Sequence, residues 1–166
     1  MNSKLLYLIS QTTVVGNPIG RISQNVTNQL VTTASSTVPV IWDTFDFAIN
    51  NMVSGPAGFT VPLQGYYLVN ATMTFGSAST GYTDPLANTM GIISVLVDGI
   101  LTSRGSEMYY VDTTSAGPYA SVVSDVLYID QGGTVSAEAF GSIPSGSLYS
   151  YANDHETFFS LAYICA

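Results

Sequence analysis

The sequence has few charged residues, one cysteine and no long apolar run near its start, and each shortage excludes a class of protein. Only 8% of the 166 residues are charged, and three basic residues face eleven acids, for a formal charge of −8. Phosphate binding needs clustered lysine or arginine, so we expect no nucleic-acid partner. The lone Cys165 excludes a domain built on disulfides within the chain. The apolar run Leu5–Ile9 is shorter than a signal-peptide core or a membrane helix, so we expect no membrane insertion.

Residues suited to catalysis or metal binding are also scarce. His155 is the single histidine, and neither it nor Cys165 has partners at the spacing of a metal site. The carboxylates of Asp43 and Asp46, and that of Asp112 with loop carbonyls, offer oxygen ligands for calcium, but no calcium-loop motif surrounds them. The sequence has no nucleophile elbow and no glycine-rich phosphate loop. We therefore expect a non-enzymatic protein without a cofactor or a metal.

What the sequence does contain is a series of short apolar or alternating segments, which is typical of a β-sandwich or barrel. The clearest segment, 59–75, has apolar residues at its odd positions, and a strand turns such a set to one face of its sheet. These odd positions are expected in the core. The other face begins with Tyr66 and Leu68, which are apolar although the face becomes polar further along. We expect a neighbouring subunit to cover this face.

The remaining segments and loops complete an all-β pattern. Further strands are predicted at 38–47, 91–97, 121–129, 134–140 and 157–164. Asp98-Gly99 predicts a two-residue hairpin turn, because both central residues of a type I′ turn need positive φ. The loops 76–90, 104–120 and 141–156 are polar and rich in tyrosine, which offers a large contact area at low entropic cost. These tyrosines either form binding surfaces or fold onto the sandwich; they are Tyr82, Tyr109, Tyr110, Tyr119, Tyr149 and Tyr151.

Residues 1–37 differ in composition from the rest of the chain. They contain no acid, two of the three basic residues, and a stretch rich in Gln, Asn, Ser and Thr. One interpretation is an arm that becomes ordered on a partner, and the other is a first strand or a frayed tail. We expect an N-terminal arm or anchoring segment at 1–37 and a head domain at 38–166.

Several motifs resemble those of the C1q/tumour-necrosis-factor (TNF) superfamily. The run from 59 to 67 resembles the F-x-x-P-x-x-G-x-Y signature of that family, with Phe59, Pro62, Gly65 and Tyr67 at its four fixed positions. Three later segments resemble further family motifs in the same order, and they are 97–99, 127–135 and 157–161. The second of them departs from the family by reading Gly-Gly-Thr where a Gly-Asp turn is usual. The resemblance covers about residues 38–166 and implies a ten-stranded antiparallel jelly-roll sandwich.

The same resemblance implies a homotrimer whose inner sheets pack about a three-fold axis, with Tyr66 and Leu68 as buried trimer contacts. It also implies binding sites on outer loops or between subunits. Small trimers of this kind without a collagen stalk resemble decoration, spike or fibre-head proteins of virus particles. We expect a virion surface component whose residues 1–37 attach to a capsid. The alternatives are a soluble or cell-surface ligand that binds a receptor, which is extracellular, and a carbohydrate-binding jelly roll.

Overall fold

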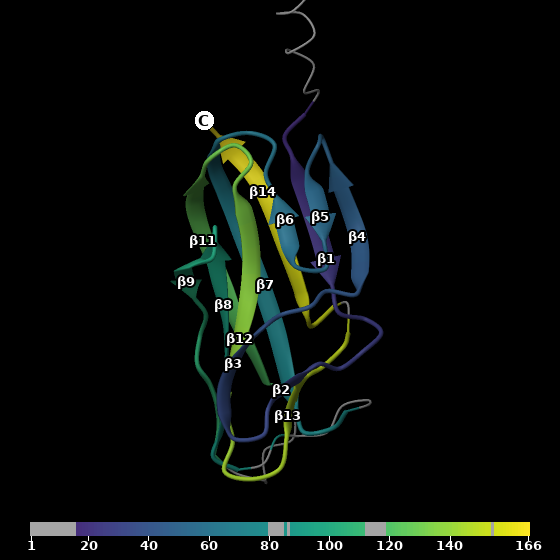
Figure 1. The fold of residues 1–166 in the computed structure, drawn as a ribbon, viewed down its shortest axis with the longest axis vertical. Helices are drawn as coiled ribbons and strands as arrows, with labels where there is room; N and C mark the ends of the chain where they lie inside the picture. The colour runs from purple at the N-terminus through teal and green to yellow at the C-terminus, as the bar shows by residue number, and fades with distance from the viewer. Residues whose placement is uncertain (1–15, 80–84, 86, 112–118, 154) are drawn as a thin grey trace, which may run out of the picture.

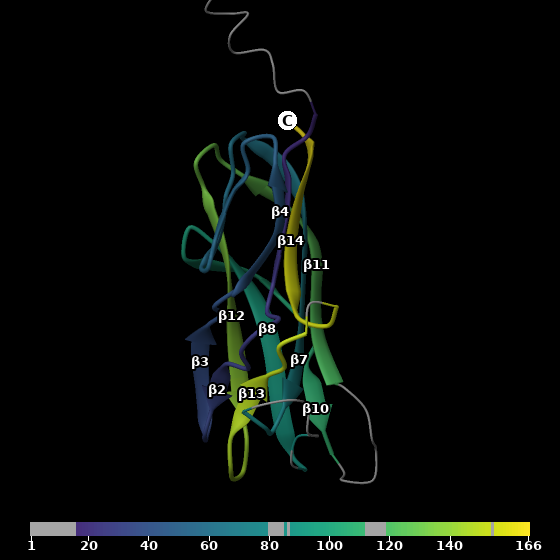
Figure 2. The same ribbon diagram turned by 90° about the vertical axis from the view of Figure 1, so that its right-hand side faces the viewer.

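The computed structural model describes residues 16–79, 85, 87–111, 119–153 and 155–166. Fourteen strands form two antiparallel sheets of seven strands each within these residues, and the sheets face each other as the two layers of a sandwich (Figure 1). The turned view of Figure 2 shows the layers nearly edge-on, with the C-terminus at the end where the described chain begins. No helix among the described residues is long and apolar enough to cross a membrane.

Sheet A is organised around its longest strand, β7 (Gly65–Gly76). One edge of β7 pairs with β11 (Tyr119–Ile129) over its whole length, and the other pairs with β14 (Phe158–Cys165). Beyond β14 lie β1 (Ile19–Ser23) and then β4 (Thr44–Ile49), which ends the sheet. The short strand β13 (Leu148–Ser150) pairs with the last residues of β7, and β2 (Leu30–Thr32) pairs with β13.

Sheet B is organised around β8 (Thr89–Val97) and β12 (Thr134–Ser142), which pair along most of their length. The other edge of β12 takes two partners, β6 (Gly58–Thr60) and β3 (Ser35–Pro39), one after the other. The free edge of β6 pairs with β5 (Val53–Gly55), while β8 pairs with β9 (Ile100–Arg104) and β10 (Met108–Tyr110). The prediction of an antiparallel β-sandwich is therefore confirmed. Strands expected to be continuous are divided, since 38–47 contains parts of β3 and β4 and 59–75 contains parts of β6 and β7.

The core lies between the sheets and follows the period of two in the sequence. In β7 the residues Val69, Ala71 and Met73 are fully buried, while Tyr66 and Leu68 face away from the core. Aromatic rings from different strands fill the centre of the core. The ring of Phe159 in β14 lies 5.3 Å from that of Phe59 and 5.7 Å from that of Trp42.

The four residues that resemble the superfamily signature lie where β6 leads into β7. Phe59 and Tyr67 are buried, and Pro62 is partly buried between the two strands. The hydroxyl of Tyr67 donates a hydrogen bond of 2.7 Å to the carbonyl oxygen of Leu63, and burial raises the pKa of Tyr67, so this donor keeps its proton. Gly65 has φ +147°, and a Cβ there would stand 2.4 Å from the carbonyl oxygen of Cys165, so the position requires glycine.

The hairpin between β8 and β9 has the predicted geometry. Asp98 and Gly99 both have positive φ, 51° and 77°, as a type I′ turn requires. The Asp98 carboxylate accepts a 2.7 Å hydrogen bond from the backbone N–H of Thr134, which attaches this hairpin to the start of β12.

The expected boundary at residue 38 is not a boundary of the fold. It lies inside β3, and β3 pairs with β12 from Pro39 to Ser35. Upstream, β1 pairs on both sides with β14 and β4, and its Ile22 is fully buried. The polar composition of this segment favoured an arm over the alternative of a first strand, but its polar side chains have partners within the fold, since Gln24 and Gln29 donate hydrogen bonds to backbone carbonyls of residues 41 and 39. Residues 19–37 thus belong to the sandwich, and residues 1–15 lie outside the described residues.

Candidate subunit interface and binding surfaces

The outward side of β7, β11 and β14 is a continuous surface without a charged residue. The strand registers place these residues side by side across the three strands. From β7 come Tyr66, Leu68, Asn70 and Thr72; from β11 come Val122, Ser124, Val126 and Tyr128; from β14 come Phe158, Ser160, Ala162 and Cys165. We call these twelve residues the sheet A face. A water-exposed sheet face ordinarily carries charged residues, so the composition of the sheet A face is typical of a surface that another protein covers.

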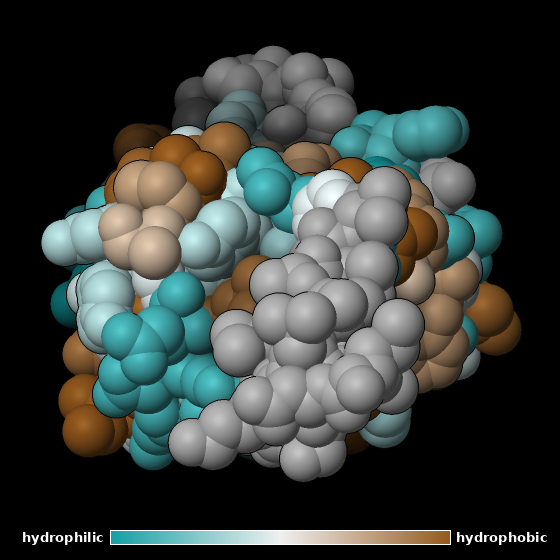
Figure 3. All heavy atoms as spheres, turned by 90° about the horizontal axis from the view of Figure 1, so that it is seen from above, coloured by the Kyte–Doolittle hydropathy of each residue, from teal (hydrophilic) through white to brown (hydrophobic). Residues whose placement is uncertain are grey.

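Large apolar side chains gather at the end of the sheet A face near the C-terminus. Tyr66 stands opposite Tyr128, and Leu68 stands opposite Val126. The rings of Tyr66 and Tyr128 meet edge to face with centroids 5.3 Å apart. All four residues remain 36–49% exposed in the single chain. Seen from this end of the molecule, hydrophobic residues form separate areas around the rim with hydrophilic residues between them (Figure 3). A cluster of half-exposed large apolar residues indicates an interaction site.

The centre of the sheet A face is polar, and one pair of its side chains bonds across two strands. The Ser124 hydroxyl donates a 2.8 Å hydrogen bond to the side-chain oxygen of Asn70 on the neighbouring strand. The Ser124 hydroxyl and the Asn70 side-chain oxygen are therefore able to lose their contact with water at lower cost, because each already has a partner.

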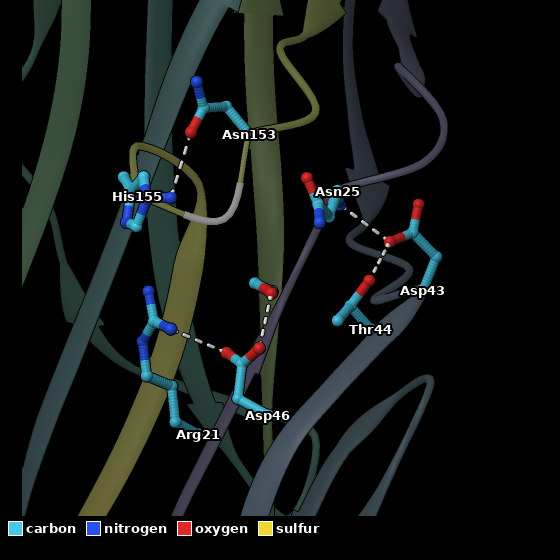
Figure 4. A network of polar contacts seen from close by, with 8 residues as sticks. Arg21, Asn25, Asp43, Thr44, Asp46, Asn153 and His155 are labelled. Atoms are coloured by element: carbon cyan, nitrogen blue, oxygen red, sulfur yellow. Dashed lines mark hydrogen bonds and ion pairs between the residues drawn. The ribbon is translucent and has the colours of Figure 1, made fainter.

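On the outward side of the described strands of sheet A, charged residues lie at the β1 and β4 side. The Arg21 guanidinium forms a 2.8 Å ion pair with Asp46 and lies 4.8 Å from the ring centroid of Phe158. Asp46 also accepts a hydrogen bond of 3.2 Å from the hydroxyl of Ser23 (Figure 4). Asp46 is the extra residue of a β-bulge, which sets its side chain against β1. Beside this group, Phe47 is 45% exposed.

The aspartates considered for calcium serve as hydrogen-bond acceptors within the fold. The Asp43 carboxylate accepts backbone N–H bonds of 2.8–3.1 Å from residues 25–27 and a 3.0 Å bond from the Thr44 hydroxyl. Figure 4 shows the bonds from Asn25 and Thr44. Burial on its own raises the pKa of Asp43, but these four bonds together hold the pKa below its ordinary value of 3.8. With Asp46 bonded to Arg21 and Ser23, neither carboxylate is arranged to bind a cation. Asp112 lies outside the described residues.

His155 and Cys165 lie apart from any group of metal ligands in the described part of the chain. His155 is exposed in the turn before β14, and its backbone N–H donates 3.0 Å to the side-chain oxygen of Asn153 (Figure 4). Cys165 is an exposed free thiol at the end of β14. The described residues contain no group of three or more His, Cys, Asp or Glu suited to a metal ion.

The six tyrosines proposed for binding have different surroundings. Tyr109 in β10 is 54% exposed, whereas its neighbour Tyr110 is 2% exposed and its ring meets that of Tyr119 at 4.8 Å. Tyr110 is therefore part of the core, and it is not available to a partner. Tyr119, Tyr149 and Tyr151 are partly buried, and Tyr82 lies outside the described residues.

Sequence reasoning missed the third of the sheet A face that β11 contributes. Val122, Val126 and Tyr128 lie at even positions of the predicted strand 121–129, whose odd positions face the core. An apolar residue on both sides of a strand was the signal used for Tyr66 and Leu68, and the same signal was present here.

Comparisons with known proteins identify the fold. No protein-family model and no curated protein matches the sequence. Among solved structures, murine APRIL at pH 5.0 is similar with a TM-score of 0.57 and 14% sequence identity, covering 90% of this chain and 100% of that one. The chain has a TNF-like jelly-roll fold. Eiger TNF from S. frugiperda is similar with a TM-score of 0.59 and 11% identity, over 90% of this chain and 93% of that one. The jelly-roll prediction is thus confirmed at the level of the TNF-like fold.

Proposed function

We propose that this protein is a non-enzymatic binding protein that assembles as a homotrimer through the sheet A face. The observation that carries this proposal is the cluster of Tyr66, Leu68, Val126 and Tyr128, which is half exposed on a face without charge. Burying large apolar side chains of this kind supplies most of the free energy of association in a stable interface. The TNF-like fold and the superfamily motifs at 59–67 support the same assembly.

Sheet A also meets a geometric requirement of a three-fold ring. In such a ring each subunit uses two different surfaces, because contacts run head to tail around the axis. The two edges of sheet A are formed by β11 and β4, and both carry exposed apolar residues. Val122 and Val126 are 46% and 49% exposed at one edge, and Phe47 and Ile49 are 45% and 46% exposed at the other. Each subunit therefore has two apolar surfaces to offer to its neighbours.

We propose no enzymatic activity because the two carboxylates considered above for ligand binding have partners within the fold. Asp43 and Asp46 bond to neighbouring strands and loops, so they stabilise the fold instead of facing a substrate. A binding role suits this arrangement better than a hydrolytic one.

Within this function we favour a surface component of a virus particle, attached through the residues before β1. Two observations support it: the low content of charged residues, which suits lasting contacts with protein, and the apolar run Leu5–Ile9. The alternative is an extracellular receptor-binding ligand, which is favoured by the similarity to murine APRIL and Eiger TNF. Immunogold labelling of the virus particles whose genome encodes this protein tests the first role. Flow cytometry with the labelled full chain on candidate cells tests the second.

Light scattering of the full chain tests the trimer. Three chains of 17.6 kDa give an expected mass of 52.8 kDa. Leu68→Lys places a charge in the apolar cluster and is expected to give the monomer mass, because a buried unpaired charge is very costly. The matched control is Val26→Lys, which adds the same charge at a side chain that is 78% exposed in the loop after β1. A wild-type monomer, or a Leu68→Lys variant that stays trimeric, contradicts the proposal.

A further inference from the structure

A groove of about 660 Å³ opens on sheet B, in the layer opposite the sheet A face. Its lining comes from the end of β3 and the residues that follow it, the turn between β5 and β6, and the neighbouring strands β8 and β12. Its volume is in the range of small-molecule sites in proteins. Because the groove belongs to the other sheet, it stays open whether or not the sheet A face is covered.

The groove exists because two strands share one edge of β12. β6 pairs with β12 up to Ser136, and β3 pairs with it from Glu138 onward, so the two strands separate at Ala137. The turn before β6 then approaches β12 closely on one side of the gap. Gly58 has φ +137°, and a Cβ there would lie 2.1 Å from the carbonyl oxygen of Val135. The opening is therefore determined by strand pairing, and it does not depend on a side-chain rotamer.

One wall of the groove, residues 39–41, is held in place by two glutamine side chains. Gln29 accepts a 2.9 Å hydrogen bond from the N–H of Ile41 and donates a 2.7 Å bond to the carbonyl of Pro39. Gln24 donates a 2.8 Å bond to the carbonyl of Ile41. Between them, the N–H of Val40 donates to the carbonyl of Ala137 at 2.9 Å. Since these backbone groups have partners, the wall presents apolar side chains and is already formed before a ligand binds.

The chemistry of the lining combines apolar side chains with a single charge. Pro39, Ile41, Pro56 and Leu96 supply apolar surface, and Glu138 is the one charged residue of the lining. Glu138 is partly buried, and its carboxylate has no hydrogen bond or ion pair with any described residue. A carboxylate in apolar surroundings attracts a cationic donor more strongly than one in open water.

We propose that this groove binds a small organic molecule in which a cationic amine is attached to an apolar body. The ammonium group donates to the Glu138 carboxylate, and the apolar body packs against Pro39, Ile41 and Leu96. The formal charge of −8 favours the approach of a cation and opposes that of an anion. This site lies on sheet B and the proposed subunit interface lies on sheet A, so ligand binding and trimer formation are tested independently.

Three probes with the same apolar body and different charge test the proposal: 4-phenylbutylamine, 4-phenylbutanol and 4-phenylbutyrate. Each is titrated into the full chain while methyl resonances are followed by NMR. We expect the amine to shift the methyl resonances of Leu96, Ile41 and Val38, and to bind about tenfold more tightly than the alcohol, as a charge-assisted hydrogen bond implies. The anionic probe, 4-phenylbutyrate, is expected to bind most weakly of the three.

Two variants make the result decisive. Glu138→Gln keeps the size of the side chain. It is expected to reduce the affinity for the amine to the affinity that the wild type has for the alcohol, with an unchanged melting temperature. Ala57→Phe fills the groove from the β5–β6 turn and is expected to abolish binding of both the amine and the alcohol. Equal binding of amine and alcohol to the wild type overturns the proposal. An amine affinity that is unchanged in either variant also overturns it. Methyl shifts that are confined to residues of sheet A do the same.

Discussion

Tyr66 and Tyr128 stand directly opposite one another on β7 and β11, and their rings meet edge to face at 5.3 Å with an angle of 72°. The Tyr128 hydroxyl accepts a 3.0 Å hydrogen bond from the side-chain amide of Gln64, which fixes the ring further. Both tyrosines nevertheless remain nearly half exposed. The pair is a preformed and rigid apolar surface, and rigid aromatic groups contribute strongly to binding because little entropy is lost.

Truncating this pair is expected to weaken the trimer. With Tyr128→Ala, the protein concentration at which half of the chains are monomeric should rise by roughly tenfold or more, since a buried interface tyrosine commonly contributes over about 1.4 kcal/mol. Sedimentation velocity over a dilution series measures this concentration. Tyr109→Ala is the control, because Tyr109 is similarly exposed but lies on β10 of sheet B. Equal effects of the two substitutions would argue against the sheet A face as the interface.

The Asp43 carboxylate should make stability depend on pH at the acid end. Its pKa is lower in the folded protein than its ordinary value of 3.8, so its contribution is complete well above 3.8 and is lost as the pH falls through the folded pKa. Asp43→Asn is expected to cost about 1 kcal/mol at pH 7, a modest amount because the group is largely in contact with water. Urea unfolding at pH 7 and at pH 3 should show a difference from wild type that narrows at the lower pH.

Asp130→Asn serves as the control for this measurement. Asp130 is an exposed turn residue between β11 and β12, and its side chain has no hydrogen bond with a described residue. The substitution is expected to leave the stability at both pH values close to that of the wild type. A constant difference between wild type and Asp43→Asn across the pH range would contradict the role assigned to Asp43.

Gly65 at the start of β7 should not tolerate a side chain. Gly65→Ala brings a Cβ within 2.4 Å of the carbonyl oxygen of Cys165 and forces alanine to φ +147°. We expect a loss of about 2 kcal/mol or more in unfolding free energy, and a melting temperature lower by roughly 4–8 °C. Gly55→Ala is the matched control, because Gly55 in β5 has open space around its Cβ position. Calorimetry at one protein concentration compares the two, and similar melting temperatures would refute the close contact.

Adjacent residues of β14 should differ sharply in their effect on stability. Phe159 is fully buried between Trp42 and Phe59, so Phe159→Ala is expected to cost about 3–5 kcal/mol through lost burial and a cavity. Phe158 points to the sheet A face beside Arg21, so Phe158→Ala should cost about 1 kcal/mol in the folding of a subunit. Urea unfolding at fixed concentration distinguishes them. Comparable losses would show that the assignment of faces in β14 is incorrect.

The sequence predicted the parts of this protein that depend on local periodicity. Alternation in 59–75 located the core face of β7, and Asp98-Gly99 located the hairpin between β8 and β9. These features follow from the period of two in a strand and from the φ angles of a turn, which neighbouring residues determine. The same alternation indicates an apolar outer surface at Tyr66 and Leu68, and β11 carries the same pattern at Val126 and Tyr128.

The rest was decided by contacts between residues distant in the sequence. The polar segment 19–37 became β1, β2 and β3 because strands from the end of the chain, such as β14 and β12, offer it edges for pairing. Tyr109 and Tyr110 are neighbours, yet only the second is buried, because the ring of Tyr119 from another strand meets it. The groove beside Glu138 needs β3, β6, β8 and β12 together. A strand's sequence reveals that it has two different faces, but only the packed sheets determine what lies against each of them.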